Sequence, residues 1–252
     1  MARAINPLEA AVEPAKKELV IFFIIDRSGS MSGTKIGAVN TAMREVLPVL
    51  RGIGGSDATI KIAILGFSTE AYWISPPASV DEFIWEDITA VGWTDFGAAL
   101  NMLCEKMSRK EFLNSGTGYA APVCILMSDG QPTDSWIAPL ELLRQNNWFK
   151  LATKIAIAIG NDTDKKVLTE FTSNPQAVLV SHTPEDLKKL IKIVTLTSSQ
   201  IGSKNTAINV GNVFTDRNSA AQQFAVSAIT TSMQSDPDLA ASLYDDEIDD
   251  DF

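Results

Sequence analysis

Residues 19–32 read LVIFFIIDRSGSMS, and this stretch decides the fold. Its first seven residues, Leu19 to Ile25, are all apolar and rich in β-branched and aromatic types. An unbroken apolar run of this length is typical of a strand that is covered on both faces in a parallel sheet. We therefore predict that these residues form a strand in the middle of the sheet.

The sequence turns polar at the end of this strand and places three oxygen donors at alternate positions, Asp26, Ser28 and Ser30. In open α/β sheets, ligands bind in the crevice outside the carboxyl ends of the strands. A helix cap would account for one Ser or Asp at this point, but not for three. The pattern therefore predicts a ligand site here, provided that other segments bring further donors.

The rest of the chain alternates between strand and helix patterns. Further strands are predicted at residues 59–67, 71–74, 122–127, 154–159 and 177–180. Apolar residues at helical spacing predict helices at 36–50, at 96–107, from about 135, at 164–171 and at 184–194. This alternation predicts an α/β fold with a doubly wound, mostly parallel six-stranded sheet and helices on both faces.

The predicted domain occupies residues 16–200, after a polar lead-in at residues 1–15. Residues 201–252 hold nine acidic residues against two basic ones, so this segment carries −7 of the net charge of −10. Its helical periodicity is weak, apart from one candidate short helix at 220–233. We expect a mobile acidic tail that lies outside the folded body.

Composition narrows the function classes. With 45% hydrophobic and 21% charged residues, the chain resembles an ordinary soluble protein, and no apolar run approaches the roughly 20 residues that a membrane span needs. No signal peptide pattern is present at the start, so we expect a cytoplasmic protein. No basic stripe is present, which argues against nucleic-acid binding. Cys104 and Cys124 fit core positions, and the single histidine, His182, has no partner for a zinc site.

Two other segments supply the further oxygen donors. They are Thr94 in GWTDFGAAL and Asp129 in LMSDGQPTD, the latter at the end of a predicted strand. Thr94 or Asp95 is also expected to cap the helix that follows. With Asp26, Ser28 and Ser30, the set contains two carboxylates and three hydroxyls. Hard oxygen donors without His or Cys suit Mg²⁺, and Mn²⁺ as a close alternative.

These three segments resemble the metal-ion-dependent adhesion site of von Willebrand factor A domains. The resemblance covers about residues 16–200 and fills all five ligand positions of the family pattern in order: Asp26, Ser28, Ser30, Thr94 and Asp129. The continuation DRSGSMSGTKIGAVNTAM is similar to bacterial intracellular members, particularly the TerY-like group linked to tellurium resistance.

The resemblance implies a Rossmann-like fold and a non-enzymatic role in metal-dependent protein binding. An Asp or Glu of a protein partner would complete the coordination of the metal, in a stress-response, defence or signalling complex. Relatives suggest a kinase and phosphatase set or an AAA+ ATPase as partner. Trp93 and Trp136 either add apolar contact area beside the site or pack into the core, and Asp95 departs from the small residue or Asn often found there.

Two alternatives remain. A Mg²⁺-dependent phosphohydrolase of the haloacid-dehalogenase type also begins with an apolar strand that ends in Asp, but it needs a second Asp where this chain has Ser28. An adaptor domain of an AAA+ ATPase machine differs from the first interpretation only in its partner. The sequence identifies no partner, and it leaves open whether the acidic tail inhibits the site or only aids solubility.

Overall fold

The computed structural model of the chain describes residues 16–51, 58–114, 116, 118–160, 163–204, 214–237 and 239. The predicted lead-in, residues 1–15, lies outside this part. The strands are β1 (Lys17–Asp26), β2 (Ala58–Phe67), β3 (Ala71–Ser79), β4 (Val123–Ser128), β5 (Thr153–Ile159) and β6 (Val178–Ser181). The α-helices are α1 (Thr34–Arg51), α2 (Phe96–Lys106), α3 (Ile137–Gln145), α4 (Asn147–Leu151), α5 (Lys165–Thr172), α6 (Pro184–Lys204) and α7 (Phe214–Gln234).

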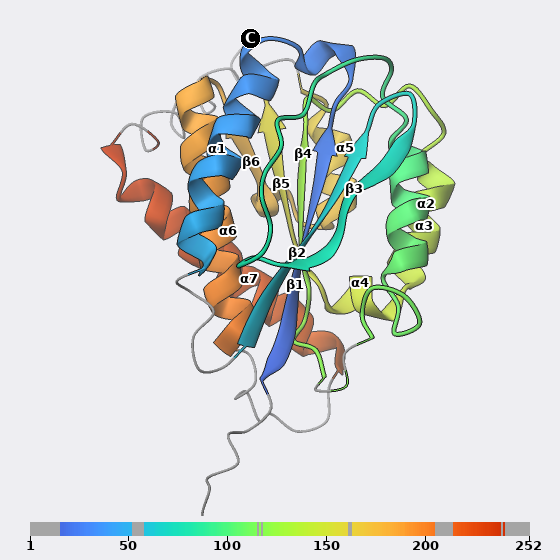
Figure 1. The fold of residues 1–252 in the computed structure, drawn as a ribbon, viewed down its shortest axis with the longest axis vertical. Coiled ribbons are helices and arrows are strands. Elements are labelled where there is room, and N and C mark those ends of the chain that lie inside the picture. The colour runs from blue at the N-terminus through green and yellow to red at the C-terminus, as the bar shows by residue number, and fades with distance from the viewer. Residues whose placement is uncertain are drawn as a thin grey trace, which may run out of the picture.

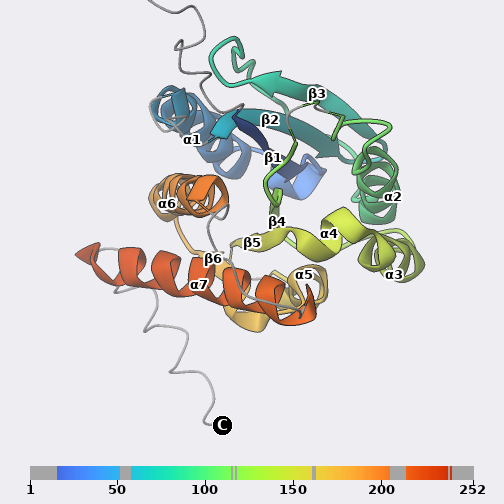
Figure 2. The ribbon, with the colours of Figure 1, turned by 90° about the horizontal axis from the view of Figure 1, so that it is seen from below.

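The six strands form one sheet in the order β3-β2-β1-β4-β5-β6. Only β3 pairs antiparallel; the other pairs are parallel. Helices α1, α6 and α7 cover one face of the sheet, and α2 to α5 cover the other (Figures 1 and 2). The predicted doubly wound α/β fold, with β1 in the middle of the sheet, is confirmed.

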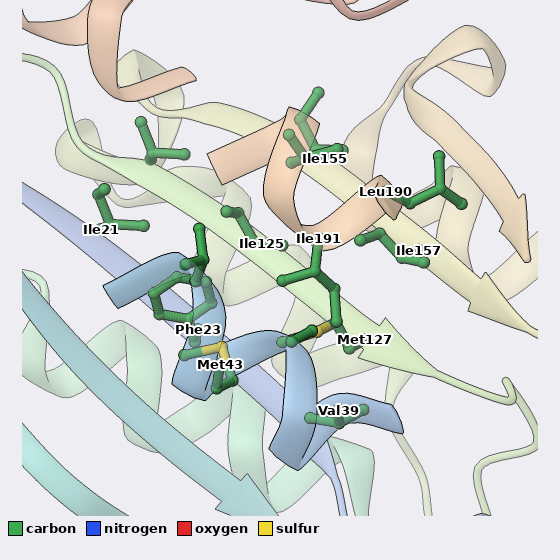
Figure 3. Close-up of a cluster of buried hydrophobic side chains, with 14 of the residues drawn as sticks. Ile21, Phe23, Val39, Met43, Ile125, Met127, Ile155, Ile157, Leu190 and Ile191 are labelled. Carbon is green, nitrogen blue, oxygen red and sulfur yellow. The ribbon is translucent and has the colours of Figure 1, made fainter. Parts of the chain in front are cut away.

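Side chains of β1 alternate between two buried clusters, as a strand covered on both faces requires. Ile21 and Phe23 join the cluster beneath α1 and α6, whereas Phe22 and Ile24 join the one beneath α2 to α5. Figure 3 shows the first cluster, in which side chains of the strands pack against side chains of the helices. The residues labelled there are Ile21, Phe23, Val39, Met43, Ile125, Met127, Ile155, Ile157, Leu190 and Ile191. This packing fixes the strand ends that carry the predicted site.

Strand β3 is longer than predicted, because it continues through Pro76 and Pro77 to Ser79. Its pairing with β2 is irregular between Ile62 and Ile64, opposite these prolines. Since β3 is an edge strand, a proline that cannot donate a hydrogen bond is tolerated there, particularly next to a bulge. The predicted end of the strand at residue 74 was therefore wrong.

The segment beyond residue 200 differs from the mobile tail that the sequence predicts. Helix α6 extends to Lys204, and α7 is longer than the candidate helix at 220–233. Ala225, Ile229 and Met233, spaced four residues apart, are at most 1% exposed, and Ile229 and Met233 belong to the cluster beneath α1 and α6. Helix α7 is therefore part of the folded body. The acidic stretch at 245–251 lies outside the described residues.

This packing predicts that Ile229→Ala lowers the free energy of unfolding by about 2–4 kcal/mol, because it leaves a cavity in the core. Phe224 on the same helix is 65% exposed, so Phe224→Ala serves as a matched control and should change stability by no more than about 0.5 kcal/mol. Urea unfolding followed by circular dichroism measures both variants. Equal effects of the two substitutions would show that α7 does not pack on the body.

The part of the chain covered by the structure contains no helix with the length and apolar character that a membrane crossing requires.

Candidate metal centre

Asp26, the last residue of β1, is fully buried at the carboxyl end of the sheet. One carboxylate oxygen, Oδ1, accepts a hydrogen bond from the backbone N–H of Ser28 at 2.8 Å. The other, Oδ2, accepts one from the Ser128 hydroxyl at 2.6 Å, and Ser128 Oγ in turn accepts from the N–H of Gly130 at 2.8 Å. These bonds hold the carboxylate in a single orientation at the end of the central strand.

Burial raises the pKa of the Asp26 carboxyl above its ordinary value of 3.8, and the nearby charge of Asp129 adds to this effect. Hydrogen bonds from Ser128 and Ser28 act in the opposite direction but do not cancel it. The ionised form of Asp26 therefore destabilises the fold, because little water reaches it. A cation bound beside this carboxylate would relieve that cost.

Ser28, Ser30 and Asp129 form one continuous chain of hydrogen bonds. Ser28 Oγ and Ser30 Oγ lie 2.9 Å apart, and Ser30 Oγ donates to Asp129 Oδ1 at 2.9 Å. Asp129 directly follows β4. Strand β4 pairs in parallel with β1, and Met127 lies opposite Ile25 in this pairing. The parallel register thus brings together side chains that are about 100 residues apart in sequence.

Thr94 is positioned by the loop before α2 and is 6% exposed. Its N–H donates to Thr133 Oγ1 at 3.0 Å, and its carbonyl accepts from the N–H of Thr133 at 2.9 Å. Thr94 also lines a narrow crevice together with Ser128 and Gly130. The threonine is therefore anchored through its backbone to the loop that follows β4, on the same side as Asp129.

Backbone hydrogen bonds attach the loop before α2, which carries Thr94, to the turn after β1. Val91 N–H donates to the Arg27 carbonyl at 2.7 Å, and Gly29 N–H donates to the Gly92 carbonyl at 2.9 Å. Gly92 has a φ of +80°, and a Cβ there would lie 2.2 Å from Thr69 Oγ1. A residue with a side chain would therefore clash as well as be strained at this position.

The donor set fits a hard divalent cation better than a soft one. Among the described residues, no group of three or more His, Cys, Asp or Glu side chains gathers at one place. A metal in this site would therefore depend on the hydroxyls of Ser28, Ser30 and Thr94 as well as on the two carboxylates. Mg²⁺ takes oxygen ligands of this kind and commonly keeps several waters.

The other residues singled out in the sequence lie elsewhere. Cys124 is fully buried in β4, where burial raises the pKa of its thiol to about 12, and Cys104 is half-buried on α2. His182 directly follows β6, a strand separated from β1 by β4 and β5. None of the three belongs to the hydrogen-bonded group around Asp26 and Asp129.

The residues flanking the site differ in exposure. Trp93, directly before Thr94, is 68% exposed, whereas Trp136 is half-buried and packs against Phe96 with ring centroids 6.5 Å apart. Asp95 does not cap α2 through its side chain. Instead, the Asp134 carboxylate accepts hydrogen bonds from Gly97 N–H at 3.1 Å and Ala98 N–H at 3.2 Å. Asp95 thus occupies the N-cap position of α2, as predicted, but the side chain that accepts from the first N–H groups of the helix is that of Asp134.

Two contributors to the site, Ser128 and Lys35, were not predicted from the sequence. Ser128 orients Asp26, and Lys35 Nζ lies 2.8 Å from Asp129 Oδ2. Ser128 is the last residue of β4 and precedes Asp129 directly, so a pairing of β1 with β4 at known register would have identified it. For Lys35 the signal was its position at the start of the first helix, directly after the turn that carries Ser28 and Ser30.

Comparison with known proteins identifies relatives of the part of the chain that contains the sheet. The family profile described as "von Willebrand factor type A domain" matches residues 21–195. Human inter-alpha-trypsin inhibitor heavy chain H6 is 30% identical over 171 residues, which cover 63% of this chain and 12% of that protein. The bovine heavy chain H4 is 32% identical over 133 residues, covering 48% of this chain and 14% of that protein. The chain thus spans about an eighth of the length of these relatives.

Solved structures share the fold. A von Willebrand factor type A protein from Catenulispora acidiphila aligns with a TM-score of 0.55 at 20% identity, over 73% of this chain and 43% of that one. Proximal thread matrix protein 1 from the mussel byssus aligns with a TM-score of 0.55 at 18% identity, over 72% and 48% of the two chains. At these identities the likeness concerns the fold alone.

Proposed function

The chain belongs to the von Willebrand factor type A domain family, and from this premise we propose that it is a metal-dependent protein-binding module. The observation that carries the proposal is the convergence of Ser28, Ser30 and Asp129 in one hydrogen-bonded chain beside the buried carboxylate of Asp26. With Thr94 on the adjoining loop, these residues would hold Mg²⁺, or Mn²⁺ in its place.

Each residue has a distinct task in this proposal. Asp26 and Asp129 supply the negative charge that attracts the cation, directly or through bound water. The hydroxyls of Ser28, Ser30 and Thr94 supply neutral oxygen ligands, so the two carboxylates balance the dication and no further negative charge is supplied by the site. The metal, when bound, contributes a positively charged coordination position that an Asp or Glu of the partner can fill.

We propose binding rather than catalysis because the site lacks the groups that a phosphohydrolase would use. Ser28 stands where the haloacid-dehalogenase mechanism needs its second carboxylate, and a hydroxyl cannot serve there as acid and base at neutral pH. His182, the single histidine, follows β6 and lies away from the hydrogen-bonded group. Asp129 is engaged by Ser30 and Lys35.

The finer proposals rest on the sequence. They are the TerY-like assignment, a cytoplasmic role in tellurium resistance or another bacterial stress response, and an AAA+ ATPase or a kinase and phosphatase set as partner. The inter-alpha-trypsin inhibitor heavy chains point to the same domain family but name no partner for this chain.

Affinity capture from the source cell, compared in Mg²⁺ and in EDTA and followed by mass spectrometry, tests the proposal. Partners should be retained in Mg²⁺ and released by EDTA, and their Asp or Glu side chains should be required. Partner binding that persists undiminished in EDTA would contradict a metal-dependent module.

A further inference from the structure

Lys35 is a cationic side chain built into the metal centre. It is the second residue of α1, and its Nζ lies 2.8 Å from Asp129 Oδ2. The Lys35 side chain is 33% exposed and that of Asp129 is 10% exposed, so water screens this pair less than an ordinary surface ion pair. The contact joins the helix start to the strand end that carries Asp129.

The two carboxylate oxygens of Asp129 accept hydrogen bonds from different partners. Oδ1 accepts from Ser30 Oγ at 2.9 Å, on the side of the predicted hydroxyl ligands, whereas Oδ2 accepts from Lys35. The amine therefore leaves the oxygen that faces the other ligands free of an ion pair. Lys35 can stay on Oδ2 while the opposite side of the carboxylate serves a cation.

Gly160, directly after β5, lies next to this lysine. Gly160 has a φ of +95°, and a Cβ there would lie 3.4 Å from Lys35 Cε and 3.5 Å from Nζ. The lysine thus packs over the end of β5 rather than extending into water. Arg27, the other basic residue in this stretch, turns away: its Nε donates to the Thr89 carbonyl at 3.0 Å, and its guanidinium lies 5.0 Å from the Tyr72 ring centroid.

The formal charge of the site follows from this arrangement. Asp26, Asp129 and Lys35 sum to −1, and a bound dication changes the sum to +1. Without the lysine the same two states would carry −2 and 0. A partner carboxylate would therefore meet a positive site only when Lys35 is present.

We propose that Lys35 sets the charge of the metal centre, so that it weakens metal binding and strengthens the binding of an acidic ligand to the metal-loaded site. This inference rests on the proposed function and adds to it a residue that determines the partner's chemistry. Loss of the lysine should move the two affinities in opposite directions. A merely structural role for Lys35 would weaken both.

The test compares Lys35→Met with Lys35→Arg and with the unaltered protein. Lys150→Met serves as a matched control, because Lys150 is exposed on α4, just before the amino end of β5 and therefore at the opposite end of the sheet. Calorimetry measures Mn²⁺ affinity at low ionic strength. Water-proton relaxation of the Mn²⁺-loaded protein then measures acetate binding, because a carboxylate that enters the coordination sphere displaces a bound water.

Lys35→Met should bind Mn²⁺ about tenfold more tightly and acetate several-fold more weakly, the size expected for one charge a few ångströms away in a partly solvated site. Lys35→Arg and Lys150→Met should resemble the unaltered protein. If Lys35→Met, with a native melt, binds Mn²⁺ no more tightly or acetate no more weakly than the unaltered protein does, the inference about Lys35 is overturned and the proposed function is not. Absence of Mn²⁺ binding in the unaltered protein would overturn the proposed function as well.

Discussion

Replacing Asp26 with asparagine is expected to weaken divalent metal binding by at least about a hundredfold and, at the same time, to make the metal-free protein more stable. Metal binding falls because one of the two carboxylates of the site is lost. Stability rises because Asp26 is fully buried, and the fold no longer contains a poorly hydrated charge. The gain should be on the order of 1 kcal/mol, since replacing buried charge by a neutral group of similar shape is often stabilising.

The new amide keeps the geometry of the site. Its oxygen can still accept from the Ser28 N–H, and its N–H₂ can donate to Ser128 Oγ, which has a second lone pair beside the one used by Gly130. The Ser128 hydroxyl loses its acceptor on Asp26, and this partly offsets the gain. Calorimetry with Mg²⁺ and urea unfolding in EDTA measure the two effects separately.

The stability difference also has a predicted pH dependence. Because burial raises the pKa of Asp26 in the folded state, the wild-type protein is destabilised at neutral pH, and that destabilisation disappears as the pH falls through the raised pKa. The amide of the variant does not titrate. The amount by which Asp26→Asn is more stable than the wild-type protein in EDTA should therefore decrease as the pH falls.

Asp186 provides the matched control for this variant. It is 7% exposed, and its carboxylate accepts from the Thr183 N–H at 3.0 Å at the start of α6, where a negative charge is favourable. Asp186→Asn should lower stability and leave metal affinity unchanged. If Asp26→Asn behaves like Asp186→Asn in both measurements, Asp26 acts only in the fold and is not a metal ligand.

Thr94→Ala should abolish most metal-dependent partner binding while the protein still binds Mg²⁺, more weakly, through the four other predicted ligands. Thr94 contributes no charge, so its loss leaves both carboxylates in place. It arrives on a loop that leads directly into α2, so coordination by its hydroxyl would couple the metal to the position of that helix. Partner binding depends on the coordination position that the partner's carboxylate would fill. It should therefore be more sensitive to this substitution than metal binding is.

The measurement compares Mg²⁺ affinity with the amount of partner captured in Mg²⁺. Thr41→Ala on α1 is the control, since the Thr41 hydroxyl bonds only within α1: it donates to the Gly37 carbonyl at 3.0 Å and accepts from Arg44 Nη2 at 3.4 Å. A Thr94→Ala protein that captures partner as well as the Thr41→Ala protein would show that Thr94 has no role in binding.

Much of this architecture could be predicted from the sequence because the relevant signals are local. The apolar run at 19–25 is unusual enough to identify a strand buried on both faces, and Asp26, Ser28 and Ser30 follow it directly. The periodicity of residues 36–50 and 96–107 identified the two helices that flank the site. The rules for parallel sheets then implied that Asp129 would lie near Asp26.

What could not be predicted depends on contacts between distant segments. Asp134 caps α2 from 36 or more residues away, and nothing near Gly97 in sequence indicates this. The contact of Lys35 with Asp129 spans 94 residues and depends on the β1–β4 register. The length of helix α7 was underestimated because its buried positions include Ala225 among many Ser, Thr and Gln residues, so its apolar stripe is narrow.

Anomalous diffraction from crystals of this protein grown in Mn²⁺ tests directly whether the five oxygen ligands hold a metal. We expect one strong anomalous peak at the carboxyl end of the sheet, within coordination distance of the Ser28, Ser30 and Thr94 hydroxyls and beside the carboxylates of Asp26 and Asp129. A peak at the acidic residues 245–251 alone, or no peak at the strand ends at saturating Mn²⁺, would contradict it.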